Sequence, residues 1–181
     1  MTEQALTGTS MRPVYIGLGS NLDDPQKQVR QALHELSVMD ECQLLDHSSL
    51  YRSDPVGPQD QPDFINAVAK LMTSLSPEAL LDRLQWLEQR HQRVRKQHWG
   101  PRTLDLDILL FEQKIIATPR LKIPPPPIGE RSFVLYPLFE IDPGLVFPDG
   151  TPLSKLTARC PIGTLERLTS PDRSLLTQVD A

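Results

Sequence analysis

The sequence has little cysteine and no long apolar run. Two cysteines in 181 residues, Cys42 and Cys160, are too few and too widely spaced for a disulfide framework or a cysteine-based zinc site. The strongly apolar stretches, such as residues 108–111, stop well short of the ~20 residues that a membrane span needs. We therefore expect a protein of the reducing cytoplasm that has no membrane role.

The sequence also lacks an overall positive charge. A formal net charge of −4 argues against general nucleic-acid binding, which needs a basic surface. The first eleven residues hold neither a basic start nor an apolar segment that would suit a secretory signal. The length fits one domain. We expect a flexible tail over residues 1–12, a single domain over 13–156 and a loosely ordered C-terminal extension over 157–181.

The hydrophobic pattern predicts a β-α-β-β-α-β core. Two-residue periods and turn residues mark the strands, while capping residues, proline at the first helical position and three-to-four-residue spacing mark the helices. The strands are expected near residues 14–19, 43–52, 64–71 and 104–111. The helices are expected near residues 24–39, with Asp24 as the side-chain cap, and from Ser76 and Pro77 into the basic stretch. This order is typical of the α+β ferredoxin-like fold, an antiparallel sheet with helices packed on it.

Further elements are expected after this core. A turn at residues 112–114 leads into a hairpin strand that extends the sheet. The proline-rich residues 123–128 lack the backbone donors of a central strand and are expected to form loop or polyproline II. A short helix over residues 133–139 is expected to dock on the core.

Two carboxylates alternate along the last predicted core strand. Residues two apart on a strand point the same way, so Asp105 and Asp107 lie side by side, opposite Leu104, Leu106 and Ile108. Magnesium suits such a pair, because it is usually held by one or two carboxylates together with substrate phosphates and water. Taken alone, the pair is more typical of two acids on a wet sheet face.

The basic stretch before the two aspartates makes magnesium binding a stronger interpretation. Residues 83–102 carry six Arg or Lys against one acid, Glu88, in a protein of negative net charge. Such a stretch on its own is typical of a solvated helix face. Directly before a pair of carboxylates, it favours a cleft that binds magnesium and phosphate, and hence an ATP-dependent transferase.

Other motifs are missing or weak. The sequence contains no complete G-x-G-x-x-G, no P-loop and no G-x-S-x-G. Its four histidines, including His91 and His98, have no metal-ligand spacing and are expected to be structural or solvated. On the predicted strand at 64–71, Asn66 shares a face with Phe64 and Val68, opposite Ile65, Ala67 and Ala69, and an amide among apolar neighbours stands out.

Several strings resemble one family. They are Gly-Ser-Asn-Leu at 19–22, Gly-Pro-Gln-Asp-Gln-Pro-Asp-Phe-Ile-Asn-Ala at 57–67, Arg-Val-Arg-Lys at 93–96 and Trp-Gly-Pro-Arg-Thr-Leu-Asp-Leu-Asp-Ile at 99–108. Together with residues 131–133 and 147–150, they resemble the 6-hydroxymethyl-7,8-dihydropterin pyrophosphokinases of folate synthesis, over about residues 14–155. The resemblance implies the ferredoxin-like fold and transfer of the β,γ-pyrophosphoryl unit of ATP to the pterin's hydroxymethyl oxygen, with release of AMP.

The resemblance also implies roles for individual residues. Asp105 and Asp107 would hold two Mg²⁺ ions, and Arg93 and Arg102 would assist transfer, with no dedicated general base. ATP contacts would come from Gln85, Glu88, Arg95, Trp99, Ile108, Arg120 and Arg131. The pterin would be held by backbone groups around Ser53, Pro55 and Val56, by the rings of Phe64 and Phe133, and by the amide of Asn66. The expected partners are ATP and the pterin alone, bound by a monomer without nucleic acid or membrane.

The chain departs from the family pattern in two places. Pro125 stands where the family commonly has a histidine that contacts the nucleotide, and the basic loop is one residue shorter before Trp99 than in some relatives. We expect the loss of this histidine to affect ATP affinity. Three alternatives remain open: a nucleotidyltransferase, which would release pyrophosphate instead of AMP, a non-catalytic nucleic-acid module, and a pterin-binding chain that transfers slowly.

Overall fold

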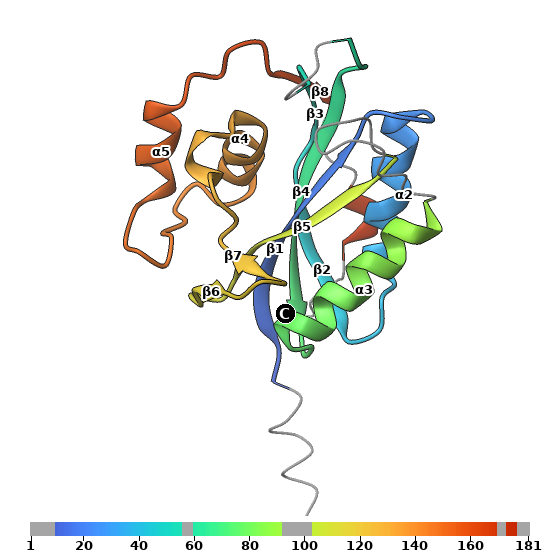
Figure 1. Ribbon diagram of the computed structural model, residues 1–181, viewed down its shortest axis with the longest axis vertical. Helices are drawn as coiled ribbons and strands as arrows, with labels where there is room; N and C mark the ends of the chain where they lie inside the picture. The colour runs from blue at the N-terminus through green and yellow to red at the C-terminus, as the bar shows by residue number, and fades with distance from the viewer. Residues whose placement is uncertain (1–9, 56–59, 92–102, 170–172, 177–181) are drawn as a thin grey trace, which may run out of the picture.

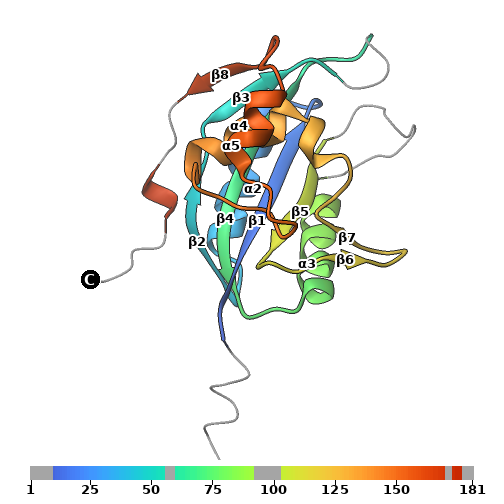
Figure 2. The same ribbon diagram turned by 90° about the vertical axis from the view of Figure 1, so that its left-hand side faces the viewer.

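The computed structural model describes residues 10–55, 60–91, 103–169 and 173–176. Its elements in chain order are β1 (Arg12–Ser20), α2 (Pro25–Ser37), β2 (Cys42–His47), β3 (Leu50–Ser53), β4 (Phe64–Thr73), α3 (Pro77–Arg90), β5 (Asp105–Phe111), β6 (Ile116–Ala117), β7 (Lys122–Ile123), η1 (Ile128–Glu130), α4 (Ser132–Ile141), α5 (Leu153–Arg159), β8 (Glu166–Thr169) and η2 (Arg173–Leu175). The main sheet is a middle layer, with α2 and α3 on one face and α4 on the other (Figures 1 and 2). Helix α5 packs on α4.

The main sheet has the strand order β5-β1-β4-β3-β8, and β2 pairs with the far half of β4. All of these pairings are antiparallel. Because β2 and β3 run one after the other along β4, they act as a single strand of the core. The resulting order, last-first-third-second, is that of the ferredoxin-like fold, which confirms the predicted class. Among the described residues, no helix has both the length and the apolar character needed to cross a bilayer.

The sheet is extended by a different segment from the one that the sequence predicts. The hairpin after β5 forms its own two-stranded sheet from β6 and β7. The main sheet instead gains β8, which pairs with β3 and comes from the C-terminal extension. The pattern beyond residue 157 has no clear period, and this four-residue strand forms through pairing with a segment more than a hundred residues away.

The predicted strand at residues 43–52 is interrupted at Ser48 and Ser49. The backbone amide of Ser48 donates to the carbonyl of Val68 at 2.8 Å, and the amide of Val68 donates to Ser48 Oγ at 2.9 Å. A serine hydroxyl thus takes the place of a backbone carbonyl in the ladder. The strand pairing is therefore interrupted between β2 and β3, while hydrogen bonds to β4 continue across the break.

The two long helices begin at the predicted residues, by different means. Ser76 caps α3, because its hydroxyl accepts a 3.1 Å hydrogen bond from the amide of Ala79. Asp24 precedes α2 with a φ of 63°, and its side chain makes no capping bond, so its expected role as a side-chain cap is wrong. The helix begins there because the carbonyl of Asp24 accepts from Gln28 and Pro25 presets the first turn.

Alternating side chains fill a separate core on each face of the sheet. On β1, Val14, Ile16 and Leu18 pack with α2 and α3, whereas Tyr15 packs with α4. Helix α4 matches the helix expected at residues 133–139 and is apolar along most of its length. A register shift in the β1–β5 pairing leaves Leu109 and Leu110 both on the α4 side. The strand residues before this shift keep their alternation.

Candidate functional site

The two aspartates of β5 face the α4 side of the sheet. Their neighbours Leu104, Leu106 and Ile108 are buried in the core on the other side, as the period-two pattern predicts. Asp105 is half-buried and Asp107 is exposed. In the pairing with β1, Asp107 lies opposite Gly17 and Asp105 lies opposite Gly19. Because glycine has no side chain, β1 places no side chain beside either carboxylate; the side chain of Leu109 lies over Gly17, and the amide of Asn66 lies beside Gly19.

The same cross-strand row leads from Asp105 to an amide. Gly19 pairs with Asp105 on one side and with Asn66 of β4 on the other. Strands lie about 4.8 Å apart, so the Cα atoms of Asp105 and Asn66 are about 10 Å apart. A Cβ added at Gly19 would lie 3.3 Å from Asn66 Oδ1 and 3.9 Å from Phe64 Cδ1. Carboxylate, glycine, amide and aromatic ring therefore meet at one end of this face.

Asn66 is buried and held in a fixed orientation. Its side chain is 5% exposed, and Nδ2 donates to Ser53 Oγ on β3 at 2.7 Å. Pro55, two residues further along, is also buried. One donor of the amide is thus occupied by the protein, while the carbonyl oxygen points toward Gly19. An amide held in this way presents both donor and acceptor character to a ligand.

Helix α4 faces this end of the sheet. Its residue Phe133 packs partly against the α4-side core, and the guanidinium carbon of Arg131 lies 6.0 Å from the centre of that ring. At the other end of the helix, Glu140 accepts hydrogen bonds from the amide of Ser49 at 3.0 Å and from the hydroxyl of Tyr51 at 2.7 Å. These bonds fasten α4 to β3.

Two tyrosines anchor this side of the molecule through neighbouring acids. The phenol of Tyr15 donates to Asp142 just after α4, and that of Tyr51 donates to Glu140. Burial, followed by these hydrogen bonds, raises the pKa of both phenols above the usual tyrosine range. Both tyrosines therefore stay neutral and act as donors.

Glu88 lies against the strand that carries the aspartates. This α3 residue is 8% exposed, and its carboxylate accepts a 2.8 Å hydrogen bond from the amide of Leu106. That amide lies between Asp105 and Asp107 in the chain. Gln85, by contrast, is exposed on the same helix. Glu88 thus has a clear contact within the protein, which ties α3 to β5.

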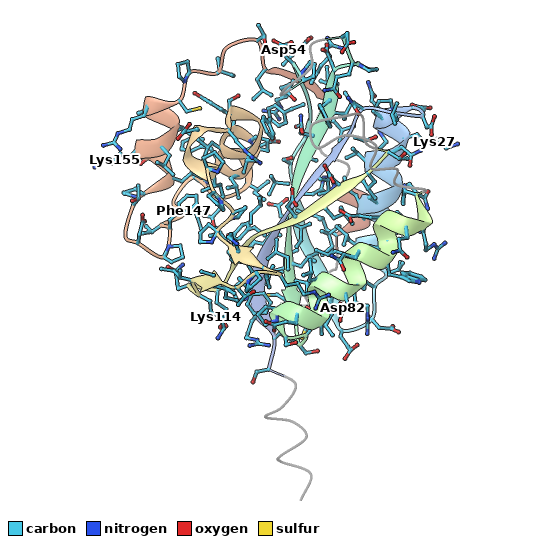
Figure 3. All side chains as sticks on the ribbon, in the orientation of Figure 1. Lys27, Asp54, Asp82, Lys114, Phe147 and Lys155 are labelled. Atoms are coloured by element: carbon cyan, nitrogen blue, oxygen red, sulfur yellow. The ribbon has the colours of Figure 1, made fainter. Side chains whose placement is uncertain are left out.

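Some expected ATP residues lie apart from this cluster. The side chain of Ile108 is in the α2/α3 core and 4% exposed, which leaves its backbone to contact a ligand. Arg120 is exposed and pairs with Asp82 on α3. Figure 3 shows Asp82 at the opposite end of the molecule from Asp54, the residue next to Ser53. The structure therefore does not bring Arg120 together with Ser53 and Asn66.

Other expected site residues cannot be placed. Arg93, Arg95, Trp99, Arg102 and Val56 lie outside the described residues. His91, just before this gap, is buried, and its ring nitrogens lie 2.5 Å from Gln28 Oε1 and 2.6 Å from Glu35 Oε1. These contacts fit the structural role expected for that histidine.

The structure also shows contacts around the site to which the sequence analysis assigns no role. Asn21, which is 1% exposed, donates to Gln61 Oε1 and to the carbonyl of Pro62, both at 2.9 Å. It thereby fastens the segment before β4 to the end of β1. Glu140 and Ser49 join α4 to β3 in a similar way. Local pattern does not reveal either pairing, because each joins residues 40 or more positions apart.

A sheet of this order, with its acidic, amide and aromatic side chains gathered at one end of one face, defines an α+β protein of the ferredoxin-like class with a polar site beside α4. Comparison with known proteins gives the family within that class. The family model for 7,8-dihydro-6-hydroxymethylpterin-pyrophosphokinase matches residues 15–143. The chain therefore belongs to this pyrophosphokinase family.

Individual relatives agree with this assignment. The 2-amino-4-hydroxy-6-hydroxymethyldihydropteridine pyrophosphokinase of Pseudomonas aeruginosa is 51% identical over 155 residues, covering 86% of this chain and 96% of the relative. The enzyme of the same name from Haemophilus influenzae is 50% identical over 146 residues, covering 81% and 91%.

Solved structures support the fold. The A437G form of Plasmodium falciparum HPPK-DHPS with pteroate superposes with a TM-score of 0.63 at 13% identity, over 82% of this chain. This chain spans 43% of that longer protein. At so low an identity, the similarity concerns the fold alone.

Proposed function

We propose that this chain transfers the β,γ-pyrophosphoryl unit of ATP to the hydroxymethyl oxygen of 6-hydroxymethyl-7,8-dihydropterin and releases AMP, as a step of folate synthesis. The observation that carries the proposal is the cross-strand row from Asp105 through Gly19 to Asn66. It sets a carboxylate and a fixed amide about 10 Å apart on one face of the sheet, with only a glycine between them. That spacing leaves room for a small flat acceptor next to a bound polyphosphate.

The pterin is held by the amide end of this row. Asn66 reads the ring's mixed donor and acceptor edge, in an orientation fixed by its bond to Ser53. Phe64 lies beside Asn66 on β4, and Phe133 lies at the start of α4, so the ring fits between aromatics from two elements. Stacking on flat side chains suits a planar heterocycle.

The phosphate end of the row suits magnesium. Among the described residues, no group of three or more His, Cys, Asp or Glu could hold a metal by itself. Two neighbouring carboxylates fit the usual magnesium pattern, in which phosphate oxygens and water complete the coordination. Bound Mg²⁺ would neutralise charge on the triphosphate and lower the pKa of the acceptor hydroxyl. We propose that Asp105 and Asp107 hold two such ions.

The chain's own residues contribute mainly by positioning. Asp105 and Asp107 orient the donor, and Asn66 with its aromatic neighbours orients the acceptor, so that the oxygen faces the β-phosphorus in line with the leaving AMP. Arg93, Arg95, Arg102 and Arg131 supply positive charge for the phosphates, with Gln85, Glu88, Trp99, Ile108 and Arg120 on the nucleotide side. No side chain is needed as a general base.

We propose further that the protein acts as a cytoplasmic monomer without nucleic acid. Both cysteines are free, as suits a reducing compartment. The exposed large apolar side chains come from separate parts of the chain, including Val38, Trp86 and Ile162. Light scattering during gel filtration would test the oligomeric state.

One incubation tests the proposed reaction. The purified chain is mixed with ATP, Mg²⁺ and 6-hydroxymethyl-7,8-dihydropterin, and the products are separated by chromatography. We expect AMP and the pterin diphosphate in equal amounts, and neither product when Mg²⁺ is chelated. Release of pyrophosphate in place of AMP would indicate nucleotidyl transfer, and no product at all would refute the transfer.

A further inference from the structure

We propose that the C-terminal segment around β8 positions the pterin side of the site, through Arg167 and Thr164. The inference deepens the proposed function and rests on it. Residues 164–169 lie beyond the part of the chain that matches the family model. Their contacts nevertheless converge on β3 and α4, the two elements that flank the proposed pterin site.

Arg167 joins these two elements. Its Nε donates to Ser49 Oγ at 3.0 Å, and its Nη2 lies 3.3 Å from Glu140 Oε2 on α4. The Glu140 side chain is 13% exposed, so its charge needs nearby compensation. Ser49 and Tyr51 also bond to Glu140. Arg167 therefore completes a clamp that sets the spacing between β3 and α4, and hence between Ser53 and Phe133.

Thr164 acts on the end of β3. Its hydroxyl donates to Asp54 Oδ2 at 2.6 Å. Asp54 lies between Ser53, which holds Asn66, and Pro55, whose backbone is expected to contact the pterin. The turn carrying Thr164 is itself anchored, because the neighbouring Leu165 is 8% exposed and its amide donates to the carbonyl of Ile162. The contact therefore fixes the chain where it leaves β3 toward the ligand.

A third contact of the same segment supplies a matched control. Glu166 pairs with Arg52 across the β3–β8 ladder, and both side chains are about half exposed. An exposed ion pair of this kind contributes little to stability. Tyr51 and Ser53 face α4 and Asn66. Arg52 lies between them on the strand and therefore faces the opposite side. The Arg52–Glu166 ion pair thus lies on the face of β3 away from the proposed pterin site.

The test compares Thr164→Val, Arg167→Gln and the double variant with Glu166→Gln and with the unsubstituted chain. We expect the double variant to raise the KM for the pterin roughly tenfold while the KM for ATP stays within about twofold, because only the pterin side is displaced. Glu166→Gln should change neither constant, and Thr164→Ser should retain the unsubstituted values, because it keeps the hydroxyl.

Pterin affinity is also measured directly by calorimetry, with an ATP analogue that has a methylene bridge between its α- and β-phosphorus atoms. A selective loss of pterin affinity supports the positioning role. An unchanged affinity, or equal losses for pterin and nucleotide that follow a lower melting temperature, overturns it. If the unsubstituted chain forms no AMP, the proposed transfer fails, and calorimetry still decides whether β8 positions a pterin.

Discussion

The backbone amide of Leu106 donates a 2.8 Å hydrogen bond to the carboxylate of Glu88. Among the described residues, β5 is an edge strand of the main sheet, so an amide on its outer side has no partner strand there. The carboxylate of Glu88 on α3 supplies the acceptor that a neighbouring strand would otherwise supply. This amide lies between Asp105 and Asp107 in the chain. The bond therefore also fixes the position of the backbone that carries both aspartates.

Replacing Glu88 should therefore affect stability in a graded way. We expect Glu88→Ala to lower the free energy of unfolding by about 1–3 kcal/mol, because it leaves a buried amide without its acceptor. Glu88→Gln keeps an acceptor oxygen and should recover most of this loss. Urea titration measures both, with Gln89→Ala, an exposed change on the same helix, as control. Equal losses for the alanine and glutamine variants would contradict the proposed role of the bond.

The carboxylates of Asp105 and Asp107 should matter for turnover more than for folding. Asp105→Asn and Asp107→Asn keep the size of each side chain and change only surface or half-buried groups. We expect each to lower kcat roughly 10³-fold, as when metal-borne electrostatic stabilisation is lost, with little change in melting temperature. Initial rates over a range of Mg²⁺ concentrations provide the measurement. The exposed Asp40→Asn serves as control, and near-normal rates in both test variants would refute a metal role.

Gly19 and Gly17 offer a matched pair on one strand. A Cβ at position 19 would lie 3.3 Å from Asn66 Oδ1, whereas one at position 17 would lie 3.3 Å from Leu109 Cδ2. We expect Gly19→Ala to raise the KM for the pterin roughly tenfold by displacing the amide. Gly17→Ala should instead lower stability by about 1 kcal/mol through overpacking and leave the pterin KM unchanged. The reverse pattern would show that Asn66 does not face the ligand.

Alkaline pH should destabilise the protein through two buried phenols. Burial and acidic partners raise the pKa of Tyr15 and Tyr51 in the folded state, while unfolded tyrosine titrates near pH 10. Their contribution is thus complete below about pH 10 and is lost as the pH rises toward the folded values. The expected slope is up to about 1.4 kcal/mol per pH unit for each tyrosine.

Urea unfolding at pH 8 to 11 tests this slope, alongside tyrosinate absorbance of the folded protein. A variant with Tyr15→Phe and Tyr51→Phe should show a shallower decline than the unsubstituted chain. Full titration of Tyr15 and Tyr51 by about pH 10 in the folded protein would contradict the expectation.

Local pattern sufficed for much of the core. Alternation along residues 64–71 and 104–111 predicts which side chains are buried, and Ser76 with Pro77 predicts the start of α3. These features depend on neighbours within one element. The facing of Asp105 and Asn66 follows from the same periodicity, which is why two parts of the candidate site could be inferred before any geometry was known.

Long-range partners could not be predicted in this way. The four residues of β8 carry no period of their own and become a strand only against β3. The break at Ser48 depends on a bond to Val68, and the clamp at Glu140 depends on residues from three elements. Helix capping by Asp24 is expected from its residue type, yet with its φ of 63° the side chain makes no capping bond. Such features depend on the tertiary fold as a whole.

The two separate cores on either face of the sheet have a consequence for how the sequence can change over time. Of the residues assigned to ligands, the α2/α3 side of the sheet holds the side chain of Ile108 in its apolar core and the buried carboxylate of Glu88 against β5. Conservative exchanges among its aliphatic residues can therefore accumulate between lineages without reaching the acidic, amide and aromatic groups across the sheet. Aliphatic substitutions in that layer should therefore have little effect on the reaction. Fewer substitutions should be tolerated in the α4 layer, whose side chains include the proposed ligand contacts.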